Sequence, residues 1–325
     1  MNKPPDWHPV DGVLLLDKDT GLSSNAALQR AKRLFGTKKA GHTGSLDPLA
    51  SGLLPVCLGE ATKLSGFLLN HDKRYQVRIR WGITTDTGDA EGKVLTSSPV
   101  PQLTREQMQS VLQHFQGEIL QKPPMYSALK HQGRRLYALA RQGIEVERTP
   151  RPVTLHALNI LSMGADDLEL DVHCSKGTYI RTLAEDLGQA LGCGGHVTRL
   201  RRTGVGDLTL DQAYTEAWLA DVPAADRLKV LLPPDRIVEY LPAVVLSDET
   251  GFCVQHGQAV RVAESPMTGW VRLYVGQTRF LGMGEILTDG RVAPRRLLCS
   301  RSDESPGIPC FPLDGNSNGL KHRDG

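Results

Sequence analysis

The stretch AGHTGSLDPLA, residues 40–50, is where the interpretation of this chain begins, because it holds one carboxylate among small, turn-forming residues. Its apolar residues recur with neither the spacing of a helix nor that of a strand, so the stretch predicts a loop. Asp47 precedes Pro48, which steers the Asp47 backbone away from helix and removes one amide donor beside the carboxylate. Loops of this kind often carry chemistry. A lone Asp-Pro is nevertheless a common turn, so the pattern alone makes Asp47 a weak catalytic candidate.

The longer string HTGSLDPLASG, residues 42–52, resembles the catalytic motif of the TruB family of pseudouridine synthases. The resemblance extends from Asp11 to Leu298, and one departure is Asp19, which stands where family members usually carry proline. The other matching stretches are GVLLLDK (12–18), GLSSN (21–25), LGEATK (58–63), KRY (73–75) and CSKGTYIRTL (174–183).

The resemblance implies isomerisation of a uridine in RNA to pseudouridine, in which the N-glycosidic bond breaks, the uracil turns and a C–C bond forms. Such a reaction needs no cofactor and no metal, and the sequence contains no P-loop or dinucleotide fingerprint. By the resemblance Asp47 is the nucleophile and Arg181 is its cationic partner. Tyr75 is the tyrosine that packs against the target base, and it is a candidate for the final proton removal.

The resemblance also assigns contacts with the substrate to five further residues. His42 would enter the RNA loop where the flipped target base leaves its stack. Tyr179 and Leu200 match positions that contact the nucleotide, although Leu200 taken alone is better explained by core packing. Lys18 and Lys63 match basic positions near the site, with phosphate-binding or structural roles.

The substrate that the resemblance implies is tRNA, modified at the T-loop uridine of position 55. We expect the T stem-loop to be recognised by its shape and its extruded bases. No protein partner is expected, and we expect a monomer, because the sequence shows no zipper pattern and no long apolar face.

The composition is that of an ordinary soluble chain of 325 residues, with 40% hydrophobic residues, 23% charged residues and a net charge of +2. No apolar run approaches the roughly 18 residues of a membrane span, and the first residues carry no secretory signal. We therefore expect a cytoplasmic location and no membrane partner. The six cysteines form no C-x-x-C pair, which predicts reduced, mostly buried thiols instead of a zinc site or a disulfide framework.

Positive charge is concentrated in two places, the segment 29–42 and the group Arg199, Arg201 and Arg202. Both clusters are interpreted as contacts for RNA phosphates, with a solvated surface as the alternative.

Apolar periodicity predicts an α+β fold with a mixed, mainly antiparallel sheet flanked by helices, which by resemblance is the pseudouridine synthase fold. Helices are predicted after a cap at Ser23–Asn25, after a Thr104/Gln107 capping box with Gly117 ending the helix, and over Thr178–Leu191. Strands are predicted over Gly12–Asp17, Tyr75–Trp81 and Leu168–Cys174.

We expect a catalytic domain over residues 1–240, a β-rich domain over 241–300 and a disordered tail over 301–325, which is rich in Ser, Gly, Pro, Asp and Asn. The second domain resembles a PUA-like RNA-binding module. Its short strands are predicted at Ala259–Val262, Trp270–Val275, Arg279–Leu287 and Arg291–Leu298.

Three other functions remain open. The chain could be a non-catalytic RNA-binding protein, but the complete set of Asp47, Tyr75 and Arg181 argues against this. It could act on another RNA with guide RNAs in a ribonucleoprotein, which the lack of long basic tails disfavours. A carboxylate glycosidase would need a paired acid. Asp89 and Glu60 are available, but they fit no glycosidase pattern.

Overall fold

The computed structural model describes residues 10–262 and 268–298, so the expected disordered tail at 301–325 lies outside the described residues. The chain divides into two compact units, Met1–Tyr240 and Leu241–Gly325, and each of them has its own apolar core. The two units are described in turn.

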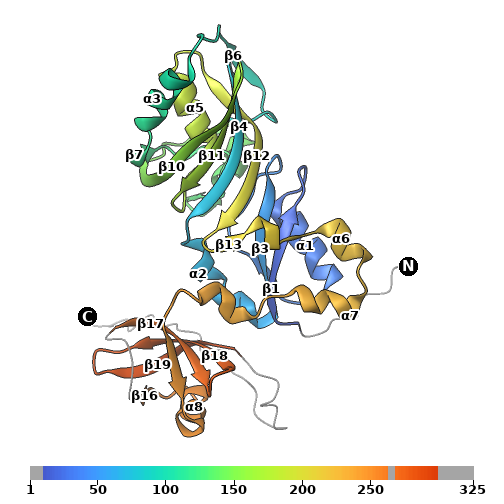
Figure 1. Cartoon of the computed structure of the whole chain (residues 1–325), viewed down its shortest axis with the longest axis vertical. Coiled ribbons are helices and arrows are strands. Elements are labelled where there is room, and N and C mark those ends of the chain that lie inside the picture. Colours follow the sequence, from blue (N-terminus) through green and yellow to red (C-terminus); the bar gives the residue numbers. More distant parts are fainter. Residues whose placement is uncertain (1–9, 263–267, 299–325) are drawn as a thin grey trace, which may run out of the picture. The chain divides into compact units, whose positions relative to one another are not determined.

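One ten-stranded sheet runs through the first unit (Figure 1). Its neighbours pair antiparallel, except for β1 with β14 and β3 with β12, which confirms a mixed, mainly antiparallel sheet. Along the sheet the order is β14 (Tyr214–Thr215), β1 (Gly12–Lys18), β3 (Ser51–Leu58), β12 (Gly195–Val205), β4 (Lys73–Trp81), β11 (Asp167–Cys174), β10 (Arg151–Met163) and β7 (Gly117–Gln121), with β2 (Ala40–His42) beside β3 and β13 (Leu208–Thr209) beside β12.

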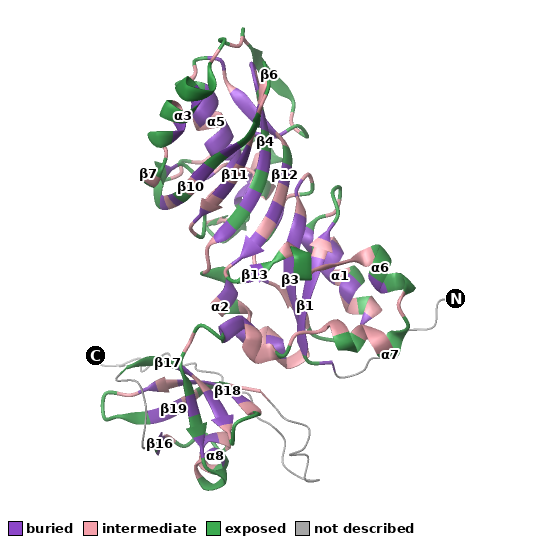
Figure 2. Ribbon diagram, viewed as in Figure 1, coloured by how far each residue is buried: buried purple, intermediate pink, exposed green. Residues whose placement is uncertain are grey.

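The strands predicted from apolar alternation are present. In β4 the odd-numbered residues from Lys73 to Trp81 are buried and the even-numbered ones are exposed, because successive side chains of a strand point to opposite faces. β11 pairs with β4 and shows the same alternation, with Val172 opposite Tyr75. Figure 2 shows the resulting buried stripes along the sheet.

Helices α3 (Arg105–Gln113) and α5 (Ile180–Ala190) pack on strands β10, β4 and β12, whereas α1 (Ser24–Leu34) and α6 (Glu216–Asp221) pack near β1 to β3 (Figure 1). Ser23 caps α1 by accepting a hydrogen bond from the Ala26 amide, and the Thr104/Gln107 capping box is present at α3.

The prediction that Gly117 ends α3 was wrong. The helix ends at Gln113, looser turns continue to Gln116, and Gly117 opens β7 with a φ of +99°. Glycine fits there because a positive φ is strained for other residues. The helix predicted over Thr178–Leu191 begins two residues later, at Ile180.

Short elements complete the first unit, and two of the strand pairs, β5 with β6 and β8 with β9, form separate hairpins. Their bounds are η1 (Gly59–Leu64), α2 (Ser65–Leu69), β5 (Ile83–Thr85), β6 (Val94–Ser97), β8 (Lys130–His131), β9 (Arg134–Arg135), α4 (Leu136–Ala140), η2 (Leu210–Gln212), α7 (Ala224–Arg227), η3 (Leu228–Val230) and η4 (Pro234–Val238).

The second unit is β-rich, as predicted. All four expected strands are present, while a strand from Ala243 to Leu246 and a helix from Asp248 to Gln255, capped by Ser247, were missed. The sheet order is β15 (Ala243–Leu246), β17 (Gly269–Val275), β18 (Arg279–Ile286), β19 (Arg291–Leu297) and β16 (Val260–Arg261), with α8 (Asp248–Gln255) beside it.

Among the residues that the structure describes, no helix combines the length and the apolar character needed to cross a membrane. Cys57, Cys174 and Cys193 are buried free thiols, and Cys253 is a partly buried one, as expected. Cys299 and Cys310 lie outside the described residues.

Candidate active site

The loop that carries Asp47 connects β2 to β3 and is held by hydrogen bonds from several sides. The buried Ser24 hydroxyl accepts from the Leu46 amide at 2.7 Å and donates to the Leu46 carbonyl at 3.0 Å. The Gly21 amide donates to the Pro48 carbonyl at 2.8 Å. Ser24 was expected as part of a helix cap, and the structure uses it to fix the loop next to the carboxylate.

Arg202 lies beneath the same loop and is only 1% exposed. Its Nε donates to the Leu53 carbonyl at 2.7 Å, and its Nη2 donates to the Gly44 carbonyl at 3.2 Å. The backbone of Gly52 passes so close that a Cβ there would lie 2.3 Å from the Arg202 carbonyl oxygen, and the φ of Gly52 is +100°. Both facts require glycine at position 52.

Arg181, on the first turn of α5, forms an ion pair with Asp47, with 2.9 Å between Nε and Oδ2. The Arg181 side chain is 6% exposed, whereas that of Asp47 is 40% exposed. The other two guanidinium nitrogens each donate at 2.7 Å, to the carbonyls of Thr87 and Tyr126. The arginine is therefore fixed in place, and the carboxylate that it holds remains accessible from solvent.

Asp89 is a second carboxylate on the same arginine, 3.6 Å from the Arg181 Nε, with a side chain that is only 5% exposed. Its Oδ1 accepts from the Thr87 hydroxyl at 2.6 Å and from the Glu91 amide at 3.1 Å. Sequence reasoning considered Asp89 only as a glycosidase acid, and it placed Glu60 in the same role. Glu60 instead pairs with Lys63 and Lys39, away from Asp47.

The surroundings of Asp47 act on its pKa in opposite directions. Burial raises the pKa, and the charge of Asp89 adds to that rise, while Arg181 and Lys18 lower it. The net direction is upward. Arg181 and Lys18 are thus the groups that favour the ionised form, which a nucleophilic carboxylate requires.

Lys18 has a structural role in this arrangement. It is 1% exposed, and its Nζ donates to the Leu22 carbonyl at 2.7 Å and to the Asp19 carbonyl at 2.9 Å, which closes the turn between β1 and α1. Burial lowers the pKa of Lys18 to about 8, against the opposing effect of Asp47. Since the contact at residue 19 is to a backbone carbonyl, aspartate can supply it as well as proline.

The charge of Asp47 acts on the phenols of both Tyr75 and Tyr179. Tyr75 lies on β4 between Val172 and Arg202, and burial raises the pKa of its phenol, although Arg202 opposes the shift. Tyr179 is the N-cap of α5, and its amide donates to Gln121 at 2.9 Å. Burial also raises the pKa of the Tyr179 phenol.

His42 lies on β2 opposite Val56, not in the loop itself. Its Nδ1 is buried without a hydrogen-bond partner among the described residues. Burial and the charge of Arg202 lower the pKa of the imidazole, so the ring is neutral near neutral pH.

The roles of Leu200 and Lys63 as substrate contacts stay predictions. Leu200 is 6% exposed in the apolar core, opposite Val77, which agrees with the packing explanation. Lys63 lies on η1 and pairs with Glu60 at 2.5 Å. η1 follows the C-terminal end of β3, whereas the Asp47 loop leads into its N-terminal end.

The basic cluster at 199–202 does not form one phosphate-binding surface. Arg199 is exposed, Arg201 pairs with Asp17 at 2.6 Å, and Arg202 is buried under the loop. Successive side chains of a strand point to opposite faces, so Arg202 points to the other face of β12 from its neighbour Arg201. On α1, Arg30 pairs with Glu216 at 3.3 Å, while Arg33 is exposed.

Family models match most of the chain. The N-terminal domain of the TruB family pseudouridylate synthases matches residues 32–180, the tRNA pseudouridylate synthase B C-terminal domain matches 181–239, and the C-terminal domain of pseudouridine synthase II TruB matches 242–298. A Coxiella burnetii (strain Dugway 5J108-111) protein named tRNA pseudouridine synthase B is 55% identical over 299 residues, which cover 90% of this chain and 96% of the relative. A protein of the same name from Nitrosococcus oceani is 54% identical over 296 residues, with the same coverages.

Solved structures share the fold. The structure of an H/ACA RNP bound to a substrate RNA containing 2'-deoxyuridine matches with a TM-score of 0.69 and 23% identity, over 92% of each chain. An archaeal box H/ACA sRNP Nop10-Cbf5 complex matches with a TM-score of 0.69 and 24% identity, over 94% of this chain and 93% of the other.

The mixed sheet with its accessible aspartate and buried arginine, together with these comparisons, defines an isomerase of the pseudouridine synthase class. Within that class the chain belongs to the TruB family, over both its catalytic part and its β-rich C-terminal part.

Proposed function

We propose that this enzyme converts the uridine at position 55 in the T loop of tRNA to pseudouridine, with Asp47 as the nucleophile. The proposal of tRNA as substrate is supported by the name of the relatives that are more than half identical over nine tenths of the chain. The observation that carries the proposed chemistry is the ion pair between the accessible Asp47 and the buried Arg181.

In the proposed reaction the target uridine leaves its stack, because a stacked nucleotide hides the bond between sugar and base. The Asp47 carboxylate bonds to the flipped nucleoside, the N-glycosidic bond breaks and the uracil takes the electron pair. Asp47 is released when the C–C bond has formed and C5 loses its proton, so one difficult step becomes two easier ones. Arg181 holds the attacking carboxylate in position through Nε, while its other nitrogens stay bound to backbone carbonyls. A preorganised partner of this kind spends no energy on reorientation during the reaction.

We assign Tyr75 the packing role in this reaction. Burial raises the pKa of its phenol, so the unliganded enzyme holds Tyr75 protonated at neutral pH, which weakens its case as the final base. A ring against the flipped base contributes about 1–3 kcal/mol of stacking. Tyr179, which precedes Arg181 at the start of α5, is proposed as the second nucleotide contact.

His42 is proposed to fill the space that the flipped base leaves. A neutral imidazole suits that position because it can stack between bases without a charge that must be desolvated. Lys63, at the far end of β3, is proposed as a contact for a more distant phosphate of the tRNA. No guide RNA or protein partner takes part in this proposal.

The test is to incubate the purified full chain with an unmodified tRNA transcript and to map pseudouridine by position. We expect one pseudouridine per tRNA at position 55, and none in a transcript that carries cytidine there. RNA binding without product would favour the non-catalytic alternative. Activity that requires an added guide RNA, or release of free uracil, would contradict the proposal.

A further inference from the structure

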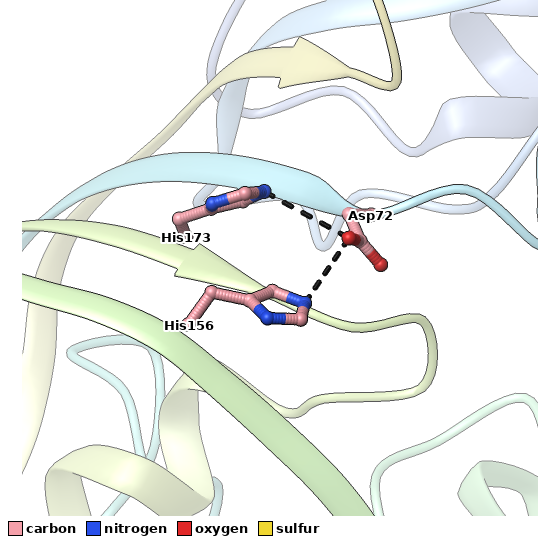
Figure 3. Close-up of side chains that lie close together, drawn as sticks. All are labelled: Asp72, His156 and His173. Atoms are coloured by element: carbon pink, nitrogen blue, oxygen red, sulfur yellow. Dashed lines mark ion pairs between the residues drawn. The ribbon is translucent and has the colours of Figure 1, made fainter. Parts of the chain in front are cut away.

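Three side chains that could bind a metal ion come together near the start of β4 (Figure 3). Asp72 precedes β4, His156 is on β10 and His173 is on β11. The Asp72 Oδ2 lies 3.1 Å from the His156 Nε2 and 3.9 Å from the His173 Nε2. All three ligand atoms lie within 4.8 Å of one another.

A bulge in β10 creates this cluster. Leu155 pairs with Cys174 and Ala157 pairs with His173, so His156 has no partner of its own in the ladder. A bulge inserts one extra residue and redirects its side chain. The two imidazole rings consequently approach to 4.7 Å between centroids, with 44° between their planes.

The cluster is separate from the active site. His173 of β11 pairs with Arg74 of β4, and both side chains lie on one face of the sheet. The next pair, Val172 and Tyr75, is buried on the opposite face. Cys174 also points to the buried side, where its thiol contacts the Lys73 carbonyl. The proposed isomerisation therefore uses none of the three cluster residues.

We propose that Asp72, His156 and His173 bind one divalent transition metal ion of the zinc type, with water as the fourth ligand. Two imidazole nitrogens and one carboxylate oxygen suit Zn²⁺, Ni²⁺ or Cu²⁺, whereas Mg²⁺ and Ca²⁺ select oxygen ligands. Three protein ligands with an open fourth position are a known arrangement for Zn²⁺.

The distances fit such an ion with small side-chain movements. Tetrahedral coordination at about 2.0–2.1 Å places neighbouring ligand atoms about 3.3 Å apart. The 3.1 Å pair is already close to this value, and the 3.9 Å pair must close slightly. The two imidazole ligand atoms lie within 4.8 Å of each other and must close by at most about 1.5 Å. The side chains of Asp72, His156 and His173 are 45%, 35% and 28% exposed, so no tight packing opposes the movement.

Nearby charges act in both directions on a bound cation. Arg74, opposite His173, disfavours it, while Asp171, two residues along the same face of β11, favours it together with Asp72. A bound ion would link the start of β4 to β10 and β11, which lie far from β4 in sequence. It would thereby stabilise the part of the sheet formed by these three strands.

The test measures metal binding by the full chain without an affinity tag. Zn²⁺ affinity is determined by competition with a chromophoric chelator, and Co²⁺ is used as a spectroscopic substitute. We expect one ion per chain, Co²⁺ absorption bands of a nitrogen and oxygen site without a thiolate charge-transfer band, and a higher melting temperature with Zn²⁺.

His156→Gln, His173→Gln and Asp72→Asn should each lower the Zn²⁺ affinity at least about tenfold, since even indirect partners of metal ligands contribute 10- to 100-fold. The matched control is His114→Gln, which removes an exposed histidine at the end of α3 and should leave the affinity unchanged. Equal affinity in the native chain and the His173→Gln variant would overturn the proposal. So would the absence of saturable binding, which would make the cluster a hydrogen-bonded group only.

Discussion

Replacing Arg181 by methionine tests the central contact of the site. The substitution keeps an unbranched apolar stem of similar length but removes the donors to Asp47 and to the carbonyls of Thr87 and Tyr126. The guanidinium is almost fully buried, so its removal leaves Asp47 without this fixed cationic partner. The variant therefore measures what the arginine contributes to kcat while the Asp47 carboxylate is still present.

The expected loss of rate follows from the contact with Asp47. A hydrogen bond to a charged group contributes about 1.5–3 kcal/mol, and the 40% exposure of Asp47 favours the lower end of that range, since solvent screens the pair. Each 1.36 kcal/mol of barrier corresponds to a factor of about ten. We therefore expect kcat to fall about 10- to 30-fold. The carbonyls of Thr87 and Tyr126, left without their donors, should also lower the melting temperature, by about 2–4 °C for each kcal/mol of stability lost.

The assay follows hydrogen release from C5 of uridine, because the new C–C bond displaces that hydrogen. A tRNA transcript labelled with tritium at C5 reports turnover, and an excess of transcript over enzyme gives kcat. A parallel run with excess enzyme shows whether the chemical step carries the loss. Arg181→Lys is the matched control. It keeps the charge but lacks the planar guanidinium, whose three nitrogens reach three separate acceptors, so its rate should lie between those of the native chain and the methionine variant. A folded Arg181→Met variant with kcat within twofold of the native value would refute the reasoning.

Three further predictions concern the groups around this ion pair. Asp47→Asn should abolish product while largely sparing tRNA binding, measured by filter retention and tritium release; retained turnover would rule out Asp47 as nucleophile. Asp89→Asn removes a charge that raises the pKa of Asp47, so the acid limb of the kcat/KM profile should move to lower pH, and a limb that stays in place or moves upward would contradict the assignment. Lys18→Met should remove a rise with pH that the free energy of unfolding shows in the native chain. Burial lowers the pKa of Lys18 to about 8 from 10.5, so the unfolded chain holds this proton more tightly, and the stability of the native chain should rise relative to the variant between these two pH values. Parallel denaturation profiles across that interval would exclude this effect.

Strands and helix starts could be predicted because their signals are local. The alternation along β4 and the capping box at Thr104 each depend on neighbours within a few residues, and both appear in the structure. The end of α3 could not be located from Gly117, because glycine serves equally to open a strand with positive φ. The choice between these uses depends on packing against β10, which local sequence does not contain.

The supports of the site depend on contacts between distant segments, so sequence patterns missed them. Arg202 was grouped with its neighbours as a phosphate contact, because burying a charged side chain is unfavourable unless polar groups surround it. The Asp47 loop supplies those groups as carbonyls of Gly44 and Leu53, about 150 residues away in sequence. Asp89 was missed as a partner of Arg181 for the same reason, since only the fold brings them together.

The pairing of one arginine with two carboxylates has a consequence for the proposed covalent step. When Asp47 bonds to the nucleoside its negative charge passes to the uracil, and a buried cation left without a fixed counter-charge is strongly unfavourable. Arg181 cannot turn toward solvent, because two carbonyls hold its remaining nitrogens. Asp89 is buried 3.6 Å from the same arginine and forms no bond in the proposed covalent step. The second carboxylate thus keeps Arg181 neutralised while the first is consumed, which lets one fixed guanidinium serve both the free enzyme and the covalent intermediate.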